Sequence, residues 1–181
     1  GHPSELVPCL VSLSPGSSQR CANQVLEAYV LAVLGGNNVL GGPGIALLEE
    51  AGVPYVGGVP VGVDEMTSPI SFQFSGGTSG AFAAFAADAA QRVKAKKVGM
   101  VYVDYGAVAD GAHEYGAELM KKLGVDEVVE VTFPLTSTDV VAPIQKALDA
   151  KPDALIVGAA DTSCAPALDA IADLELEGPV Y

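Results

Sequence analysis

Short apolar runs alternate with amphipathic stretches along the 181 residues of the chain. In residues 31–58, an apolar run up to Leu34 gives way to glycines and asparagines at 35–38. An amphipathic stretch begins near Pro43, and a second apolar run ends at Val56. Short β-branched runs are typical of buried parallel strands, and apolar residues at helical spacing are typical of packed helices. Residues 31–58 therefore predict a strand–helix–strand unit.

The same alternation continues along the chain and predicts an α/β fold with parallel sheets. We expect strands at residues 8–13, 29–34, 53–56, 98–103, 128–133 and 154–158, with helices between them. The pattern is interrupted around residues 59–80 by prolines, glycines and polar residues, which favours a division into two lobes. We assign residues 1–70 to an N-terminal lobe, 71–80 to a crossover or hinge, and 81–181 to a C-terminal lobe.

In open parallel sheets, ligands bind beside the carboxyl ends of the strands. The loop at residues 35–42 and the loop after Val56 are therefore the first places to look for a function. The strand-end loops are rich in Gly, Asn, Ser, Thr and Tyr, which offer backbone amides and neutral side chains. Such loops favour the binding of a small polar molecule without its chemical conversion.

Composition excludes several other classes of function. A formal net charge of −13 makes nucleic acid and anionic lipid poor partners. No apolar run approaches the roughly 20 residues that a membrane-spanning helix needs. The glycine-rich stretch at 40–44 lacks a following lysine, no nucleophile elbow is present, and His2 and His113 do not complete a zinc site. Nothing in these residues argues for an enzyme, although an enzyme on a doubly wound fold stays open as a third interpretation. We therefore expect a protein that is not an enzyme, with no metal and no cofactor.

The three cysteines are Cys9, Cys21 and Cys164. Cys9 lies on a predicted strand and Cys21 on the helix that follows it, and such elements pack face to face, so a disulfide is geometrically possible. Two buried thiols are the alternative. We favour the disulfide because an exported chain can retain one. Cys164 is then left without a partner in this set.

The order and spacing of several segments resemble the type I periplasmic binding proteins, most of all the leucine/isoleucine/valine-binding proteins of ABC importers. The segments that carry the resemblance are residues 31–36, 51–56, 72–75, 96–106, 111–124, 138–139 and 151–158. The resemblance covers residues 8–181. It implies two Rossmann-like lobes with parallel sheets that close over a solute.

The same resemblance implies which residues contact the solute. It places the contacts at Asn37, Asn38, Gly58, Val59, Tyr105, Asp161 and Thr162. Asn37 and Asn38 stand where the family usually has serines that hold an amino-acid carboxylate. Asparagine can still donate hydrogen bonds to a carboxylate, and Asp161 can pair with an ammonium group. Tyr105 offers a flat apolar face with a polar tip.

By resemblance, we expect the substrate-binding component of an ABC importer, which binds a branched-chain amino acid or a related amino acid, amide or carboxylate. The alternative is an extracellular sensory domain of a signalling receptor with the same fold. Either role implies a periplasmic or extracellular location, with a lipid anchor as one option. The importer role implies an ABC permease as the partner.

Members of the family are about twice as long, so the resemblance implies that both lobes are partial. The family's first strand has no counterpart here, and its place would be between residues 8–13 and 29–34. An open strand edge invites pairing. We therefore expect a first lobe that is either rearranged or completed by a second copy in a homodimer.

Overall fold

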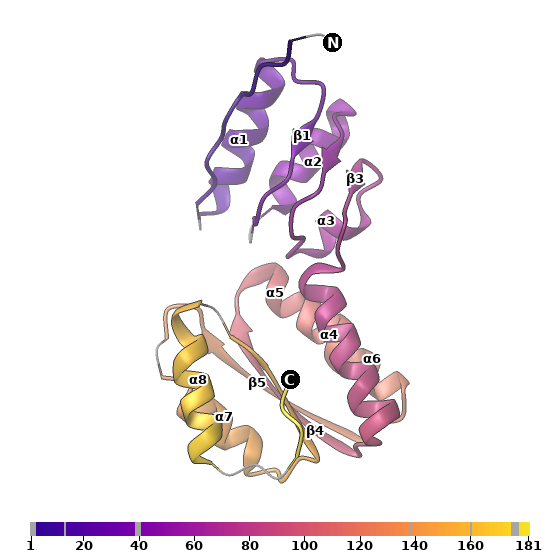
Figure 1. Cartoon of the computed structure of the whole chain (residues 1–181), viewed down its shortest axis with the longest axis vertical. Helices are drawn as coiled ribbons and strands as arrows, with labels where there is room; N and C mark the ends of the chain where they lie inside the picture. Colours follow the sequence, from indigo (N-terminus) through magenta and orange to yellow (C-terminus); the bar gives the residue numbers. More distant parts are fainter. Residues whose placement is uncertain (1–2, 13, 39–40, 138, 160, 175–177) are drawn as a thin grey trace. The chain divides into compact units, whose positions relative to one another are not determined.

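The computed structural model describes residues 3–12, 14–38, 41–137, 139–159, 161–174 and 178–181. The chain divides into two compact units, Gly1–Thr78 and Ser79–Tyr181. Each unit has its own three-stranded parallel sheet (Figure 1). This confirms the predicted α/β class with parallel sheets.

The sheet of the first unit has the strand order β1-β2-β3. Its strands are β1 (Val33–Leu34), β2 (Tyr55–Val56) and β3 (Ser71–Phe72), and its helices are α1 (Pro15–Glu27), α2 (Gly42–Ala51) and α3 (Val63–Thr67). Helix α2 begins with a proline in its first turn and ends at Gly52, which adopts a left-handed conformation with φ of 68°. The start near Pro43 follows the sequence prediction for this helix.

The two faces of this sheet are packed unequally. The register aligns Val33 with Tyr55 and Ser71 on one face. There, the buried Tyr55 packs with apolar side chains of α1 and α2, namely Ala22, Val25, Ile45 and Leu48. The opposite face carries Leu34 and Phe72, which are 74% and 55% exposed. Helices therefore cover one face of the first sheet and leave the apolar side chains Leu34 and Phe72 of the other face exposed.

The predicted strand at residues 8–13 is wrong for the part that the structure describes. Residues 3–12 run alongside α1 without forming a strand (Figure 1). They are held there by the disulfide between Cys9 and Cys21, whose Cα atoms are 5.6 Å apart, and by a hydrogen bond from Gln24 to the carbonyl of Pro8. The physical reason is the absence of a neighbouring strand, because a strand is stable only within a ladder.

The second unit has a longer sheet with the order β5-β4-β6. Its strands are β4 (Lys97–Asp104), β5 (Glu127–Pro134) and β6 (Ala154–Gly158), and Val180 forms a parallel bridge with Leu155 of β6. One helical layer contains α4 (Gly77–Ala87), α5 (Gly106–Gly111) and α6 (Glu118–Lys122), with π-helical segments at Asp88–Val93 and Ala112–Ala117. The remaining helices are α7 (Val141–Leu148) and α8 (Asp161–Asp173).

The central strand β4 is buried on both faces, as parallel strands in two-sided sheets are. Met100 and Tyr102 point into a cluster with Phe82 of α4 and Met120 of α6. The alternate residues Val101 and Val103 join a second cluster with residues of α7 and α8. The second unit therefore has helices on both sides of its sheet.

The connection between the units differs in detail from the expected crossover at residues 71–80. Residues 71 and 72 form β3, and α4 already begins at Gly77. Gly77, still within the first unit, has a positive φ of 54°, and a Cβ atom there would lie 1.9 Å from the carbonyl oxygen of Pro60. Thr78 also donates its amide to the Pro60 carbonyl at 3.0 Å. The division between the units falls within the first turn of α4.

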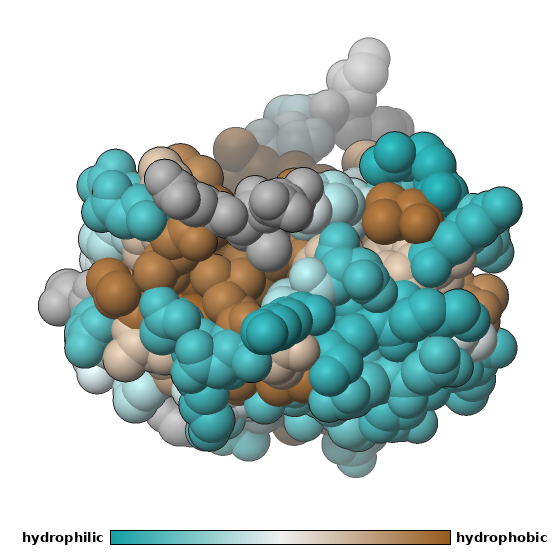
Figure 2. All heavy atoms as spheres, turned by 90° about the horizontal axis from the view of Figure 1, so that it is seen from below, coloured by the Kyte–Doolittle hydropathy of each residue, from teal (hydrophilic) through white to brown (hydrophobic). Residues whose placement is uncertain are grey.

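The surface of the molecule combines hydrophilic and apolar areas. Figure 2 shows a face on which hydrophilic residues surround an apolar area. None of the helices in the described part of the chain combines the length and the apolar character needed to cross a bilayer.

Candidate functional site

Two strand-end loops of the first unit lie against each other. Asn37, after β1, forms a parallel bridge with Val59, after β2. The Val59 amide donates a hydrogen bond of 3.1 Å to the carbonyl of Gly36. Asn37 and Val59 are both exposed, whereas Asn38 is half-buried. The structure thus brings together two of the residues that the resemblance selected, and it leaves their side chains accessible.

Gly58 allows this close approach of the two loops. Its φ is +93°, a conformation that L-residues rarely adopt. A Cβ atom at this position would lie 2.6 Å from the Gly36 carbonyl oxygen. Glycine is therefore required by both the backbone conformation and the lack of space, and Gly58 acts through its backbone shape.

The buried carboxylate of Glu65 holds both loops through hydrogen bonds. Glu65 of α3 is 1% exposed and accepts hydrogen bonds from the amides of Val61 at 2.8 Å and Gly62 at 3.3 Å. The Tyr55 hydroxyl lies 3.4 Å from the same carboxylate. The Gly36 backbone also hydrogen-bonds Tyr55, so the network joins the loop after β1 to the loop after β2.

Burial dominates the electrostatics of this network. It raises the pKa of Glu65 above its usual value, although the amides of Val61 and Gly62 oppose the shift. Burial, together with the neighbouring carboxylate, raises the pKa of Tyr55 to about 12. Glu65 and Tyr55 therefore position the two loops, and the Glu65 carboxylate is shielded from solvent.

Sequence reasoning did not identify Glu65. Its signal was present, because Glu65 stands three residues after Gly62, the residue at the start of α3. A glutamate at that spacing returns its side chain to the backbone at the start of the helix, as in a capping box. The sequence does not show that this glutamate is buried under the neighbouring loop.

In the second unit, the selected residues lie at one edge of the sheet. Tyr105 follows β4, while Asp161 and Thr162 follow β6 and begin α8. Because β4 and β6 are neighbouring parallel strands, their carboxyl ends meet at the same edge. Tyr105 is half-buried against the cluster that contains Val103, and Thr162 is exposed. The side chain of Asp161 lies outside the described part of the structure.

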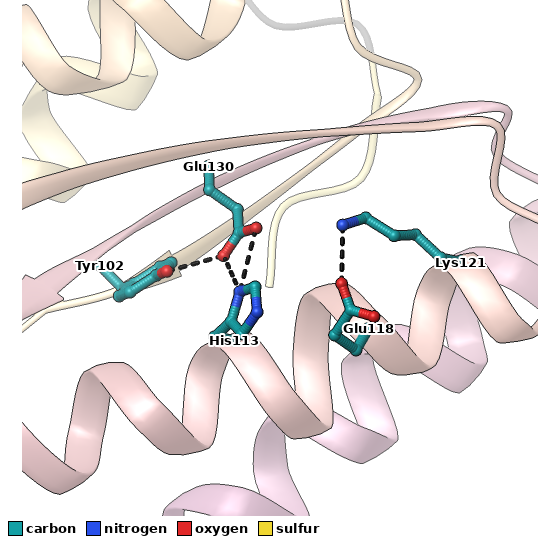
Figure 3. A network of polar contacts seen from close by, with 5 residues as sticks. All are labelled: Tyr102, His113, Glu118, Lys121 and Glu130. Atoms are coloured by element: carbon teal, nitrogen blue, oxygen red, sulfur yellow. Dashed lines mark hydrogen bonds and ion pairs between the residues drawn. The ribbon is translucent and has the colours of Figure 1, made fainter.

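The second unit also has a polar network, which lies in the middle of the β4–β5 ladder and away from the carboxyl ends of the strands. Glu130 of β5 accepts a hydrogen bond of 2.7 Å from the Tyr102 hydroxyl and lies 3.0 Å from Nδ1 of His113 (Figure 3). Hydrogen bonding to Glu130 raises the pKa of His113. Glu130 stands opposite Met100 in the middle of the ladder. The network links the edge strand β5 to the helical layer and stabilises the fold there.

The described residues contain no group of three or more acidic, histidine or cysteine side chains that could hold a metal ion. Cys164 is exposed and outside the disulfide. What the strand-end loops offer is therefore backbone amides, asparagine amides and a tyrosine ring.

Comparison with known proteins gives the same fold. The model of a periplasmic binding protein family matches residues 1–181. The leucine-binding protein LivK of Thermotoga maritima is 19% identical, with a TM-score of 0.71 over 93% of this chain and 49% of that one. A comparison with curated protein sequences found no match.

Two further similar structures are solute-binding proteins of ABC transporters from Rhodopseudomonas palustris. One, in complex with benzoate, is 16% identical with a TM-score of 0.75 over 92% of this chain and 47% of that one. The other, from strain BisB5 and in complex with 3,4-dihydroxybenzoic acid, is 24% identical with a TM-score of 0.70 over the same shares of the two chains. The chain spans about half the length of the structures it matches. Because the family model matches throughout, the chain belongs to the periplasmic binding protein family, whose members are solute-binding receptors of the periplasm or cell exterior and not enzymes.

Proposed function

We propose that the chain is part of the substrate-binding component of an ABC importer and binds a small carboxylate with an apolar body. The observation that carries this proposal is the match of the family model to the whole chain. Importer components with the same fold support the transport role, and an ABC permease is the partner it requires.

The proposed ligand class follows from the chemistry of the strand-end loops. Asn37 and Asn38 supply amide donors, and the neighbouring Gly36 is exposed. Such neutral donors favour a carboxylate, while the ring of Tyr105 favours a flat or branched apolar group. A branched-chain amino acid and a benzoate both combine these parts.

A free amino group would distinguish the two ligand types. We propose that Asp161, with Thr162 beside it, accepts the ammonium group if the ligand is an amino acid. If the ligand is a benzoate, an acidic residue in that place has no role in binding. A comparison of amino acids with benzoates in one ligand panel therefore tests the proposed role of Asp161 most directly.

The test is thermal melting against leucine, isoleucine, valine, their amides, benzoate, 4-hydroxybenzoate and 3,4-dihydroxybenzoate. It is run on the full product of the gene and, in parallel, on residues 1–181. A ligand at 100 times its Kd stabilises the folded protein by about 2.7 kcal/mol, which is a clear shift in melting temperature. A shift with one chemical class supports the proposal and identifies the solute.

Variants then locate the site. Tyr105→Ala should weaken the shift strongly and Tyr105→Phe only slightly, because the ring rather than the hydroxyl supplies the contact. Tyr29→Ala is the matched control, since Tyr29 is a 91% exposed tyrosine of the first unit. Absence of a shift across the panel for the full product would contradict the proposed ligand class, and equal losses in Tyr29→Ala and Tyr105→Ala would contradict the proposed site.

A further inference from the structure

The carboxyl group of Glu65 is enclosed by the backbone of both strand-end loops of the first unit. Its Oε2 atom accepts hydrogen bonds from the amides of Val61 and Gly62, in the loop after β2. A Cβ atom on Gly41, where the loop after β1 meets α2, would lie 2.8 Å from Oε1. Glu65 is 1% exposed, so a charge on its carboxyl group lies between the two loops and not in solvent.

The two oxygen atoms of this carboxyl group have unequal hydrogen-bond partners. Oε2 has two amide donors, whereas the partner of Oε1 in the described structure is the Tyr55 hydroxyl at 3.4 Å, which is a long contact. None of the ion pairs among the described residues includes Glu65. A buried carboxylate without a neighbouring cation is costly, so this position favours the neutral acid.

The titratable groups that face Glu65 are few. Burial raises its pKa, and the charge of Asp64 on α3 adds to the shift, while the amides of Val61 and Gly62 and the Tyr55 hydroxyl of β2 oppose it. A further negative charge brought to these loops would act in the same direction as Asp64, because it also disfavours the ionised form.

Tyr55 connects Glu65 to the loop that carries the two asparagines. The Gly36 backbone hydrogen-bonds the Tyr55 side chain, and a Cβ atom on Gly35 would lie 2.9 Å from the Tyr55 hydroxyl oxygen. Asn37 is the next residue of the same loop. A ligand carboxylate bound at Asn37 would therefore lie on the order of 10 Å from the Glu65 carboxyl group.

We propose that a carboxylate ligand binds to the first unit together with one proton, which Glu65 takes up. This inference rests on the proposed function, since it takes the ligand carboxylate to bind at Asn37 and Asn38. An anionic ligand and an ionised Glu65 repel each other through a medium from which water is largely excluded, and protonation removes the repulsion. The proton comes from the solvent and binds at Oε1, so Oε2 keeps both amides and the loops keep their positions.

The sign of the effect follows from linkage. The bound anion raises the proton affinity of Glu65, and by reciprocity the protonated protein binds the anion more tightly. The affinity is therefore highest at low pH and falls as pH rises through the pKa that Glu65 has in the complex. Two charges about 10 Å apart in a protein shift each other's pKa by about one unit, which limits the change in Kd to about tenfold.

Glu65→Gln is the variant that separates charge from structure. Glutamine has nearly the same shape, is neutral at every pH, and keeps an acceptor oxygen for the amides of Val61 and Gly62. It should bind the ligand about as tightly as the wild type does at low pH. Glu50→Gln is the matched control, because Glu50 is an exposed glutamate of the same unit, and it should keep the pH dependence of the wild type.

The test is calorimetric titration of the full product of the gene with leucine and with benzoate. The pH is varied from 4.5, the ordinary value of a glutamate, to about 8. Titration of the ligand and of other residues affects all three proteins alike, so the difference between wild type and Glu65→Gln reports Glu65. We expect the Kd of the wild type to weaken by about three- to tenfold relative to Glu65→Gln as pH rises.

Proton uptake gives a second measurement that does not depend on comparing affinities. Titrations in buffers with different heats of ionisation give the number of protons bound with the ligand, which should be larger for the wild type and Glu50→Gln than for Glu65→Gln. Equal pH dependence and equal proton uptake in wild type and Glu65→Gln would overturn the proposal, as would a relative affinity of the wild type that rises with pH. Failure of the wild type to bind either compound at any pH would instead contradict the proposed function, and this inference with it.

Discussion

Removal of the Glu65 side chain tests whether this buried carboxylate holds the two strand-end loops of the first unit. In Glu65→Ala, the amides of Val61 and Gly62 lose their acceptor. Both residues are buried, so water does not readily replace the carboxylate. The Tyr55 hydroxyl, at 3.4 Å, is a weaker partner and adds little to the loss.

The magnitude follows from these two donors. A buried donor left without a partner costs about 1–3 kcal/mol, and the cavity left by the side chain adds to this. Partial relaxation of the loop offsets part of the cost, so we expect the free energy of unfolding of the first unit to fall by about 3 kcal/mol. In a unit of this size, each kcal/mol lowers the melting temperature by about 4–8 °C.

The assay is urea denaturation monitored by hydrogen exchange of the Val33 and Tyr55 amides, which donate to the carbonyls of Pro54 and Ile70 in the first sheet and do not contact Glu65. Glu50→Ala is the matched control, because Glu50 is exposed on α2 of the same unit. It should change the stability by less than about 0.5 kcal/mol. Equal, small losses in both variants would show that Glu65 does not hold the loops.

The pH dependence gives a second check on the same residue. Because burial raises the pKa of Glu65 in the folded state, that state binds more protons between the unfolded value of 4.5 and the folded pKa. The stability of the wild type therefore falls as pH rises through this range. Glu65→Gln does not titrate, so any advantage of the wild type over this variant should shrink as pH rises. An advantage that grows with pH would contradict the burial of an ionisable carboxylate.

Three other features of the structure can be tested separately. The pKa of His113, followed by NMR, should lie above 6.5 in the wild type and return toward 6.5 in Glu130→Gln. The stabilisation that the protonated His113 gives to the folded state should be lost as pH rises through the folded pKa. A pKa at or below 6.5 in the wild type would refute the contact between His113 and Glu130. In urea denaturation, Gly58→Ala should cost about 1–3 kcal/mol and exceed Gly52→Ala, because both have positive φ but only Gly58 faces a carbonyl at 2.6 Å; equal costs would count against the close approach. Reduction of the described disulfide, which spans 12 residues, should lower the stability of the first unit by up to about 3 kcal/mol in thermal melting, and an unchanged melting curve would disagree with this.

The second unit follows the sequence pattern closely. The apolar run predicted as a strand at 98–103 lies within β4, and the run at 154–158 coincides with β6. These strands have two neighbours or a covered face, so local pattern and tertiary packing agree. The helix at Val141–Leu148 likewise lies between two predicted strands, and the Asp139 carboxylate accepts a hydrogen bond from the Val141 amide at its start.

The first unit departs from its pattern where packing partners are missing. Residues 29–34 read as a six-residue strand, but only Val33 and Leu34 form a ladder. No described strand pairs with the residues before them. Apolar character alone predicts that a segment is stable as a strand when it pairs with a neighbouring strand. It does not show whether that neighbouring strand is present.

The candidate site was partly accessible to sequence reasoning. Asn37 and Val59 were selected separately through the resemblance, and the structure places them as bridge partners. The pairing depends on the positive φ of Gly58, which a glycine in the sequence permits but does not specify. The role of these residues in binding remains a prediction that the ligand panel tests.

The two units have cores of very different size. The buried cluster of the first unit contains five described residues, whereas the second unit has clusters of thirteen and ten. Opening free energy scales with the apolar surface that must be exposed, so the first unit should form a separate, less stable cooperative unit. Limited proteolysis would then cut within residues 1–78 while the remainder stays folded, and melting curves of the whole chain would contain two transitions rather than one.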